Sequence, residues 1–280
     1  MSVRLRDVVM AQLDTLRHEP TDKRIRATIG DQTVVDSTRA LLVWEPKRVV
    51  PTYAVPLEDV AGQIDAAAPT ETAGPQGVPA AGASHLGERM VYDPSVPFSA
   101  HTTDGEVMRV RARGSDRVAD AFRPADRDLA DYVLLDFAAF DAWYEEDERN
   151  VAHPRDPFHR VDILHSSRHV RVEVGGTVLA ESTAPYLLFE PPLPVRYYFA
   201  ADDVRTDLFV PSDHLTYCAY KGEASYWSVG DEQHLAWCYR HPLRDASEVV
   251  DRIAFFNERV DLVVDGVRPE RPITPWSPPA

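Results

Sequence analysis

The sequence is poor in cysteine and lysine. Cys218 and Cys238 are its two cysteines among 280 residues, and they form no CxxC pair. A disulfide-rich scaffold and a four-thiolate zinc site are therefore excluded, and a reducing compartment fits best. The lysines are Lys23, Lys47 and Lys221, whereas Lys and Arg together number 30. Lysine is thus an unusual choice in this chain, and Lys221 lies inside its most distinctive motif.

Long apolar runs and an excess of positive charge are also lacking. Nowhere do about 18 apolar residues follow one another, which predicts no transmembrane helix. Arg4 and Arg6 interrupt the amino-terminal stretch in which a signal peptide needs an apolar core. The formal net charge is −15, and a charge of this sign repels nucleic acids and anionic membranes. We expect a cytoplasmic protein that binds neither nucleic acid nor membrane.

Sequence signatures of the common cofactor sites are absent. The chain has no GxxxxGK[ST], no GxGxxG that opens a helix and no GxSxG. P-loop, dinucleotide-binding and α/β-hydrolase sites therefore have no motif in this chain. Four histidines lie close together in the sequence, but their spacing is not that of known zinc sites; they are His153, His159, His165 and His169. We expect no bound cofactor and no metal.

Two segments of the chain repeat each other. Residues 25–53 match residues 170–198 without a gap, at a constant offset of 145 residues. The shared residues include Gly30/Gly175, Ser37/Ser182, Glu45/Glu190, Pro46/Pro191 and Tyr53/Tyr198. A second gapless block aligns residues 101–122 with residues 218–239, at an offset of 117. With about 100 to 200 residues per domain, this duplication predicts two tandem domains.

Apolar periodicity predicts a mainly β fold. Residues 4–18 have near-helical spacing, which predicts an amphipathic helix that ends before Pro20 and packs on the first domain. From Arg24 the period changes to two, which predicts a hairpin and a buried strand over residues 24–44, and the same plan recurs over residues 170–189. Each copy is predicted to end in a helix, at residues 136–148 and 247–258.

These patterns predict a division of the chain into five parts. They are an N-terminal helix (1–20), a first repeat domain (21–150), a connector (151–167), a second repeat domain (168–266) and a proline-rich tail (267–280). Residues 61–89 of the first domain are rich in Ala, Pro, Gly and Thr, and they have no counterpart in the second. This composition predicts a flexible insertion.

The most distinctive motif is TYCAYKGEASYW, at residues 216–227. In an extended chain, Cys218 and Tyr220 would face one side and Tyr217 the other. A lysine near a thiol favours the thiolate, which is the nucleophilic form, so Lys221 could activate Cys218. The alternative is that Cys218 is a small buried apolar residue, as free cysteines usually are. The first copy has His101 and Asp104 at the positions of Cys218 and Lys221.

A glutamate recurs at the same position of both copies. Glu45 and Glu190 each follow an apolar run and precede a proline. A buried carboxylate must be paired or protonated, and the repeated arginines Arg26 and Arg171 are the candidate partners. The presence of this glutamate in both copies favours a structural role.

Several of these segments closely resemble a bacterial and fungal family called domain of unknown function 427. The resemblance rests on residues 190–198, on TYCAYKGEASYW, on AWCYRHPL at residues 236–243 and on IAFFNERVDL at residues 253–262. The whole chain resembles the tandem form found in actinobacteria. Ala219 departs from the pattern, because the family usually has Pro directly after this cysteine.

This resemblance implies two tandem β-tent (Mss4-like) domains. The β-tent group includes methionine sulfoxide reductase B and the ligand-binding domain of cereblon. Several relatives in that group bind zinc through two CxxC pairs, which this chain lacks. The resemblance therefore implies the fold without a structural zinc.

Three functions remain open. The leading hypothesis is a small, partly apolar ligand in an aromatic pocket of the second domain, with Lys221 pairing with a carboxylate or phosphate of the ligand. The expected pocket residues are Tyr198, Tyr217, Tyr220, Tyr226 and Trp227, together with Glu190 and Lys221. The second hypothesis is an enzyme that uses Cys218 as nucleophile or redox thiol, with Lys221 favouring its thiolate and His214 or Tyr226 exchanging protons. The third is a protein-interaction scaffold whose aromatic residues are core.

Overall fold

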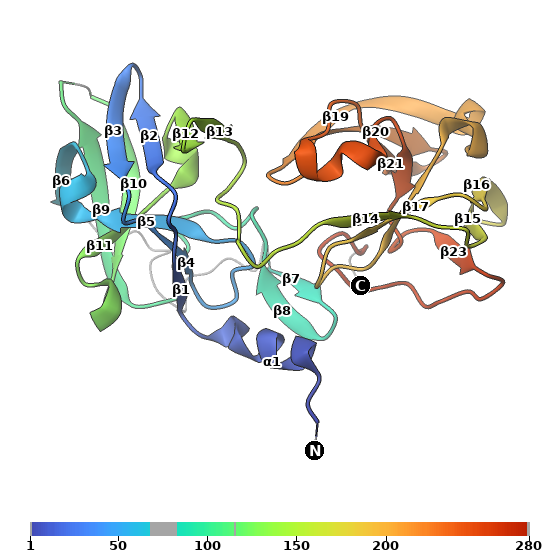
Figure 1. Cartoon of the computed structure of the whole chain (residues 1–280), viewed down its shortest axis with the longest axis horizontal. Coiled ribbons are helices and arrows are strands. Elements are labelled where there is room, and N and C mark those ends of the chain that lie inside the picture. The colour runs from blue at the N-terminus through green and yellow to red at the C-terminus, as the bar shows by residue number, and fades with distance from the viewer. Residues whose placement is uncertain (1, 68–82, 115, 279–280) are drawn as a thin grey trace. The chain divides into compact units, whose positions relative to one another are not determined.

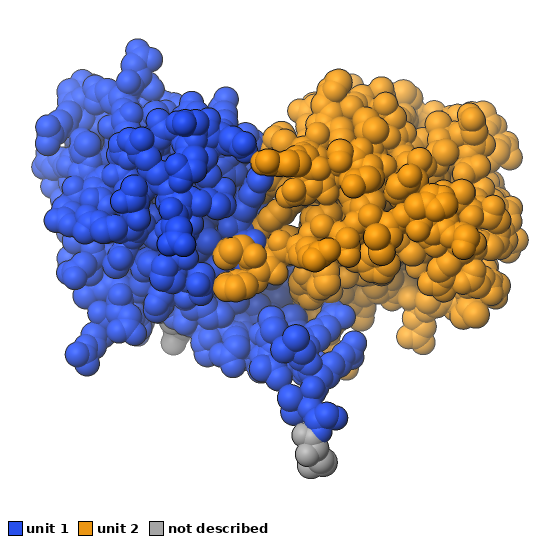
Figure 2. Space-filling view, viewed as in Figure 1, with its two compact units in different colours: residues 1–84, 90–156 blue, residues 85–89, 157–280 orange. Residues whose placement is uncertain are grey.

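The structure is a computed structural model that describes residues 2–67, 83–114 and 116–278. It consists mostly of antiparallel strands, which confirms the mainly β expectation (Figure 1). The chain forms two compact units (Figure 2). The first unit comprises residues 1–84 and 90–156, and the second comprises residues 85–89 and 157–280. In the described ranges, no helix has the length and apolar character needed to cross a membrane.

The first unit contains two main sheets. Its strands are β1 (Arg17–Pro20), β2 (Ile25–Ile29), β3 (Gln32–Ser37), β4 (Leu41–Trp44), β5 (Thr52–Pro56), β6 (Gly62–Ala66), β9 (Gly105–Ala112), β10 (Val118–Pro124), β11 (Tyr132–Leu135), β12 (Ala142–Glu145) and β13 (Glu148–Asn150). The strand orders are β1-β4-β5-β11-β10-β9-β6 and β13-β12-β2-β3. The helical segments are α1 (Leu5–Ala11) and the 3-10 turns η1 (Gln12–Asp14), η2 (Leu57–Asp59), η3 (Arg127–Leu129) and η4 (Phe137–Ala139). Two further strands, β7 (Ala83–Leu86) and β8 (Arg89–Tyr92), form a two-stranded ribbon, of which residues 85–89 are assigned to the second unit.

The second unit has the same plan. Its strands are β14 (Asp162–His165), β15 (Val170–Val174), β16 (Thr177–Ser182), β17 (Tyr186–Phe189), β18 (Arg196–Phe199), β19 (Phe209–Cys218), β20 (Gly222–Val229), β21 (Glu232–Tyr239), β22 (Ile253–Phe255) and β23 (Asp261–Val264). The sheet orders are β14-β17-β18-β22-β21-β20-β19 and β16-β15-β23. Three 3-10 segments complete it: η5 (Ala201–Asp203), η6 (Thr206–Leu208) and η7 (Arg244–Val249).

The sequence repeat is also a structural repeat. The two seven-stranded sheets have the same strand order, position by position. When 145 is added to their residue numbers, strands β1 to β4 have the same bounds as β14 to β17. When 117 is added, β9 has the same bounds as β20. Even a small hydrogen bond recurs, because Ser37 and Ser182 each donate to an aspartate at 2.7 Å, Asp59 and Asp203.

Alternating side chains give the second large sheet two different faces. Phe199, Ala236 and Phe255 point to a core shared with the three-stranded sheet. Their neighbours Tyr198, Trp237 and Ala254 belong to a separate cluster on the other face. Successive residues of a strand point to opposite sides, so one sheet can carry both clusters. We call the second side the tyrosine face; its defining residues are Tyr198, Tyr226 and Tyr239.

The N-terminal helix is shorter than its sequence pattern predicts. Helix α1 ends at Ala11, and Pro20, the expected helix stop, belongs to strand β1. Met10 and Leu13 are buried, whereas the apolar residues Val3, Leu5, Val8 and Val9 are exposed. A short helix has little stability of its own, and residues 17–20 satisfy their backbone groups by pairing with β4 instead.

The predicted helices at the end of each copy are wrong. Residues 136–148 form turn η4 and strand β12, and residues 247–258 contain the end of η7 and strand β22. Glu146 and Asp251 have positive φ angles of 52° and 55°, which a continuing α-helix does not allow. Strand β22 lies between β18 and β21, so neighbouring strands, rather than helical hydrogen bonds, satisfy this backbone. The apolar spacing in these segments was compatible with both structures, and the tertiary pairing decided between them.

The expected insertion, connector and tail also make contacts with the folded units. Within the expected insertion, Gly62–Ala66 is strand β6, which pairs with β9, and residues 68–82 lie outside the described residues. Within the expected connector, β14 pairs with β17. In the expected tail, Thr274 donates to Glu258 at 2.5 Å. The second unit therefore uses residues on both sides of the sequence repeat.

Candidate functional site

A tight turn between two strands positions the TYCAYKGEASYW motif. Strand β19 ends at Cys218, and β20 starts at Gly222. Gly222 has φ of +94°, and a Cβ at this position would lie 3.2 Å from the carbonyl oxygen of His241. The turn therefore needs glycine, both for its backbone angle and for the close approach. The Leu243 amide donates to the Lys221 carbonyl at 3.0 Å, which holds the turn against the following loop.

Strand pairing decides which motif residues share a face. Cys218 is opposite Gly222 and Thr216 is opposite Ala224. The Thr216 and Tyr226 hydroxyl groups lie 2.7 Å apart, so Thr216 is on the tyrosine face. Cys218 is two residues further along the strand and half-buried, and it therefore faces the same side. Tyr217 points the other way and is 38% exposed.

Lys221 is buried and paired with Glu190. Its Nζ donates to Glu190 Oε1 at 2.5 Å, and His159 Nε2 lies 3.0 Å from the same oxygen. Burial acts to lower the pKa of Lys221, but the negative charges of Glu190 and Cys218 outweigh it and raise this pKa above its ordinary value. Burial acts to raise the pKa of Glu190, but Lys221 and His159 bring it below its ordinary range. Both groups are therefore held in their charged forms.

The glutamate partners expected from the sequence are wrong. Arg171 pairs with Glu173 at 2.7 Å, and Arg26 pairs with Asp147 at 2.6 Å. Glu190 pairs with Lys221 and His159 instead, and Glu45 accepts from His101 and from the Thr102 amide. Arg26 and Arg171 lie on strands of the smaller sheets, β2 and β15, whereas the glutamates directly follow strands β4 and β17 of the large ones.

Three tyrosines around this ion pair are kept protonated. Burial raises the pKa of Tyr198, Tyr226 and Tyr239, and in each case it is the largest cause. The charge of Cys218 further raises the pKa of Tyr226 and Tyr239, which places the thiol within electrostatic reach of both phenols. A neutral phenol can donate a hydrogen bond at neutral pH. The site therefore combines a thiol, three phenol groups and a neutralised ion pair.

The hydroxyl group of Tyr239 is the unmatched polar group of this site. Tyr239 as a residue is 5% exposed, and its hydroxyl has no hydrogen-bond partner among the residues that the structure describes. The hydroxyl oxygen is not one of the fully buried unpaired atoms, so solvent reaches it. The other two phenols are engaged, since Tyr226 bonds to Thr216 and Tyr198 accepts from Trp237 Nε1 at 3.3 Å. The Tyr239 hydroxyl therefore has a donor that no described residue uses and that a ligand atom could accept.

The structure brings together some of the expected site residues and separates others. Lys221 and Tyr226 interact electrostatically with Cys218, and Glu190 and Tyr198 interact with Lys221. The ring of Tyr220 lies 4.6 Å from that of His159. Trp227 lies on the opposite side of the sheet, where it packs on Phe209 at 6.1 Å and belongs to the other core. Tyr217 and Trp227 are therefore outside the tyrosine-face cluster.

Sequence reasoning missed His159, Tyr239 and His234. His159 lies in the expected connector and has no repeated counterpart, so no pattern in the sequence marks it. Tyr239 carried a usable signal, because it aligns with Phe122 of the first copy and differs from it by one hydroxyl. His234 stacks on His214 at 4.6 Å, and His214 lies 4.9 Å from Tyr226. The sequence did name His214 and Tyr226, as alternative candidates for proton exchange.

The matching place in the first unit is closed. His101, which aligns with Cys218, is 1% exposed and stacks on Phe122 at 3.7 Å. Its Nδ1 lies 3.1 Å from Glu45 Oε2, so histidine and glutamate satisfy each other inside a packed core. The second unit has a half-buried thiol at this position. Of the two repeats, the second therefore has the more accessible polar cluster.

Cys238 behaves as a packing residue. It is buried, and burial raises the pKa of its thiol. It aligns with the fully buried Ala121 of the first copy. A buried neutral thiol is chemically inert, so Cys218 is the cysteine on which the site depends. In the described ranges, no group of three or more His, Cys, Asp and Glu is arranged to hold a metal ion.

The fold and the site describe a two-unit, mainly β protein with one polar cluster on the tyrosine face of its second unit. Comparison with protein families agrees with the repeat. The model of the family described as domain of unknown function (DUF427) matches residues 17–77 and 162–266, one segment in each unit. The chain belongs to this family. No curated protein matches the chain.

Proposed function

We propose that the second unit binds a small, uncharged molecule with a hydrogen-bond-accepting oxygen and a partly apolar body. The binding place is the Cys218 site, which we define as Glu190, Tyr198, Cys218, Lys221, Tyr226 and Tyr239. The observation that carries the proposal is the Tyr239 hydroxyl, which extends from a buried ring, has no partner among the described residues and lies within electrostatic reach of Cys218. Aromatic rings supply apolar area, and a convergent polar group supplies orientation.

The charge balance of the site favours a neutral ligand. From the sequence alone, Lys221 was expected to pair with an anionic group of the ligand. In the structure Glu190 already neutralises Lys221 at 2.5 Å, and His159 also contacts Glu190. Because the two charges of this pair neutralise each other, the pair offers neither an anion nor a cation an uncompensated opposite charge. Desolvating either kind of ion without a partner is costly, whereas a carbonyl oxygen needs only the donor that Tyr239 offers.

Three probes of the same size test this charge preference. We would measure alkylation of Cys218 by iodoacetamide in the presence of benzamide, benzoate or benzylamine, with peptide mass spectrometry as the readout. Benzamide is expected to protect Cys218, and the two ions are expected to leave its rate unchanged. Cys238 is the internal control, because its alkylation would report unfolding. Protection by benzoate alone would restore the anion hypothesis and contradict the neutral one.

The variant Tyr239→Phe tests the hydroxyl directly. The first repeat carries Phe122 at the matching position, so the fold accepts phenylalanine there. Loss of one hydrogen bond is expected to weaken benzamide binding about three- to tenfold, measured by calorimetric titration. Tyr144→Phe, in the first unit, serves as the matched control. Equal affinity in all three proteins would show that Tyr239 does not contact the ligand.

A second candidate function is chemistry at Cys218. The observation that favours it is that Cys218 is half-buried and lies within electrostatic reach of the buried Lys221, because a lysine near a thiol is one of the arrangements found around reactive cysteines. His214, whose ring lies 4.9 Å from that of Tyr226, is a candidate for proton exchange. The pH dependence of Cys218 alkylation tests this function. Rapid reaction already at neutral pH would support a nucleophile, whereas reaction only after unfolding would exclude it.

We also propose that the protein acts in the cytoplasm without a nucleic-acid or membrane partner. Its net charge of −15 supports this proposal, because such a charge opposes binding to phosphate backbones and anionic lipids. Sedimentation with vesicles of anionic lipid, and gel shift with duplex DNA at low salt, are the measurements. Binding in either experiment would overturn it.

A further inference from the structure

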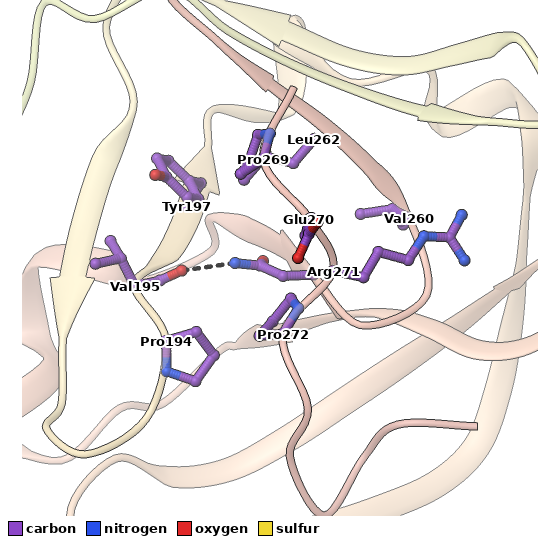
Figure 3. A pocket seen from close by; sticks show the side chains of 10 residues that line it. Pro194, Val195, Tyr197, Val260, Leu262, Pro269, Glu270, Arg271 and Pro272 are labelled. Atoms are coloured by element: carbon purple, nitrogen blue, oxygen red, sulfur yellow. Dashed lines mark hydrogen bonds between the residues drawn. The ribbon is translucent and has the colours of Figure 1, made fainter. Parts of the chain in front are cut away.

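We propose a second ligand site in the second unit, one that binds a small organic amine. The site is a cavity of about 220 Å³ that we call the Asn257 pocket. Its lining residues are Pro194, Val195, Tyr197, Asn257, Val260, Leu262, Pro269, Glu270, Arg271 and Pro272. They come from the loop before β18 and from β18 itself, from the segment leading into β23, from β23, and from the chain that follows it (Figure 3).

The Asn257 pocket is separate from the Cys218 site. Tyr197 lines the pocket, and its neighbour Tyr198 belongs to the tyrosine face. Adjacent residues of a strand point to opposite sides of the sheet. The pocket residues Tyr197, Val260 and Leu262 accordingly pack with the core on the other side. Binding at one site can therefore be measured without occupying the other.

Asn257 supplies an unused hydrogen-bond acceptor. Its side chain is 8% exposed, and its Nδ2 donates to the Val195 carbonyl at 2.8 Å, the bond drawn in Figure 3. This bond fixes the orientation of the amide. The Oδ1 atom accepts no hydrogen bond from any residue that the structure describes. This oxygen is not one of the fully buried unpaired atoms, and Asn257 lines the pocket. An amide oxygen can accept hydrogen bonds, so the pocket is suited to a ligand that brings an N–H group.

The charges around the pocket favour a cation. Arg271 is paired with Asp261 at 3.1 Å, a carboxylate that Arg268 also contacts at 3.3 Å, and Figure 3 shows the Arg271 guanidinium directed away from Glu270. Glu270 has no ion-pair partner in the described part of the chain, and Figure 3 shows its carboxylate among the lining residues, between Val195 and Val260. An ammonium group can pair with Glu270 and donate to Asn257 Oδ1 at the same time. A carboxylate ligand would instead meet two acceptors.

The walls of the pocket are suited to an apolar body. Pro194, Pro269 and Pro272 supply rigid apolar surface, and Val260 and Leu262 close the pocket on the strand side. Typical small-molecule pockets hold about 300 to 1,000 Å³, so a cavity of about 220 Å³ selects small ligands. The ligand class is therefore a primary amine with one short alkyl or single-ring group.

Titration of the full chain with benzylamine tests the proposal. We expect saturable binding by calorimetry, and no binding of benzoate at the same place. Glu270→Gln should weaken benzylamine about two- to fivefold, the contribution of one exposed ion pair. Glu270→Lys should abolish benzylamine binding and create affinity for benzoate. Glu248→Lys, another exposed glutamate of the second unit, is the control for the change in net charge.

The outcomes separate this proposal from the function of the Cys218 site. Benzylamine bound in the Asn257 pocket should leave Cys218 alkylation and the Tyr239→Phe variant unaffected. Failure of benzamide to protect Cys218 would count against the Cys218 site alone. Absence of saturable benzylamine binding, or equal affinity in the wild-type and both Glu270 variants, would overturn the amine pocket.

Discussion

The ion pair between Lys221 and Glu190 is the clearest energetic feature at the scale of single residues. Both side chains are buried, and the Nζ–Oε1 distance is 2.5 Å. Removing one partner leaves the other charged and buried. Lys221→Met should therefore cost about 3 to 5 kcal/mol of unfolding free energy, measured by urea denaturation. The double variant Lys221→Met/Glu190→Gln should recover most of this loss, and a double variant as unstable as the single one would refute the pairing.

The same pair predicts a defined pH dependence. The pKa of Glu190 is lowered in the folded state. Its contribution to stability is therefore fully present above the unfolded pKa of about 4.3. This contribution is lost as the pH falls through the folded pKa. The pKa of Lys221 is raised, so its contribution is present below the unfolded pKa of about 10.4 and is lost as the pH rises through the folded value. The stability difference between wild type and the double variant should thus be greatest near neutral pH and shrink at both extremes. A difference that does not change from acid to alkaline pH would contradict this prediction.

The turn that joins β19 to β20 is the element on which the Cys218 site depends. Gly222 combines a φ of +94° with a close approach to the His241 carbonyl. Gly222→Ala should lower the free energy of unfolding by about 1 to 3 kcal/mol, measured by urea denaturation, and should expose Cys218 to alkylation. Gly230→Ala is the matched control, because Gly230 also has a positive φ, of +56°, but a Cβ there meets no atom within 4 Å. Equal losses for the two variants would show that the backbone angle, and not the contact, limits this turn.

Elements also show where sequence patterns were sufficient. The hairpins β2–β3 and β15–β16 follow from alternating apolar residues with a glycine between them. The structure of residues 247–258 did not follow from the sequence pattern. The spacing of Val249, Val250 and Ile253 is compatible with a helix and also with a 3-10 turn followed by a strand. Only the neighbouring strands β18 and β21 decide in favour of β22.

At the scale of the whole molecule, duplication predicts two folding units. Each unit has its own buried clusters, with Leu134 in the first and Leu188 in the second. We expect two transitions in differential scanning calorimetry. Leu134→Ala and Leu188→Ala should each destabilise one unit by about 2 to 5 kcal/mol and shift only the transition of that unit. A single transition that both variants lower equally would mean that the two units unfold together.

The sequence by itself determined the repeat, the β character of both copies, and the concentration of polar residues at Cys218 and Lys221. These properties are local or periodic, so they can be read from residue spacing. The tertiary structure decided that Glu190 pairs with Lys221 and His159, that Trp227 lies away from Tyr226, and that Tyr239 is buried beside the thiol. Such contacts join residues that are distant in the sequence. Strand order and register determine which side chains come into contact, and no local sequence pattern encodes them.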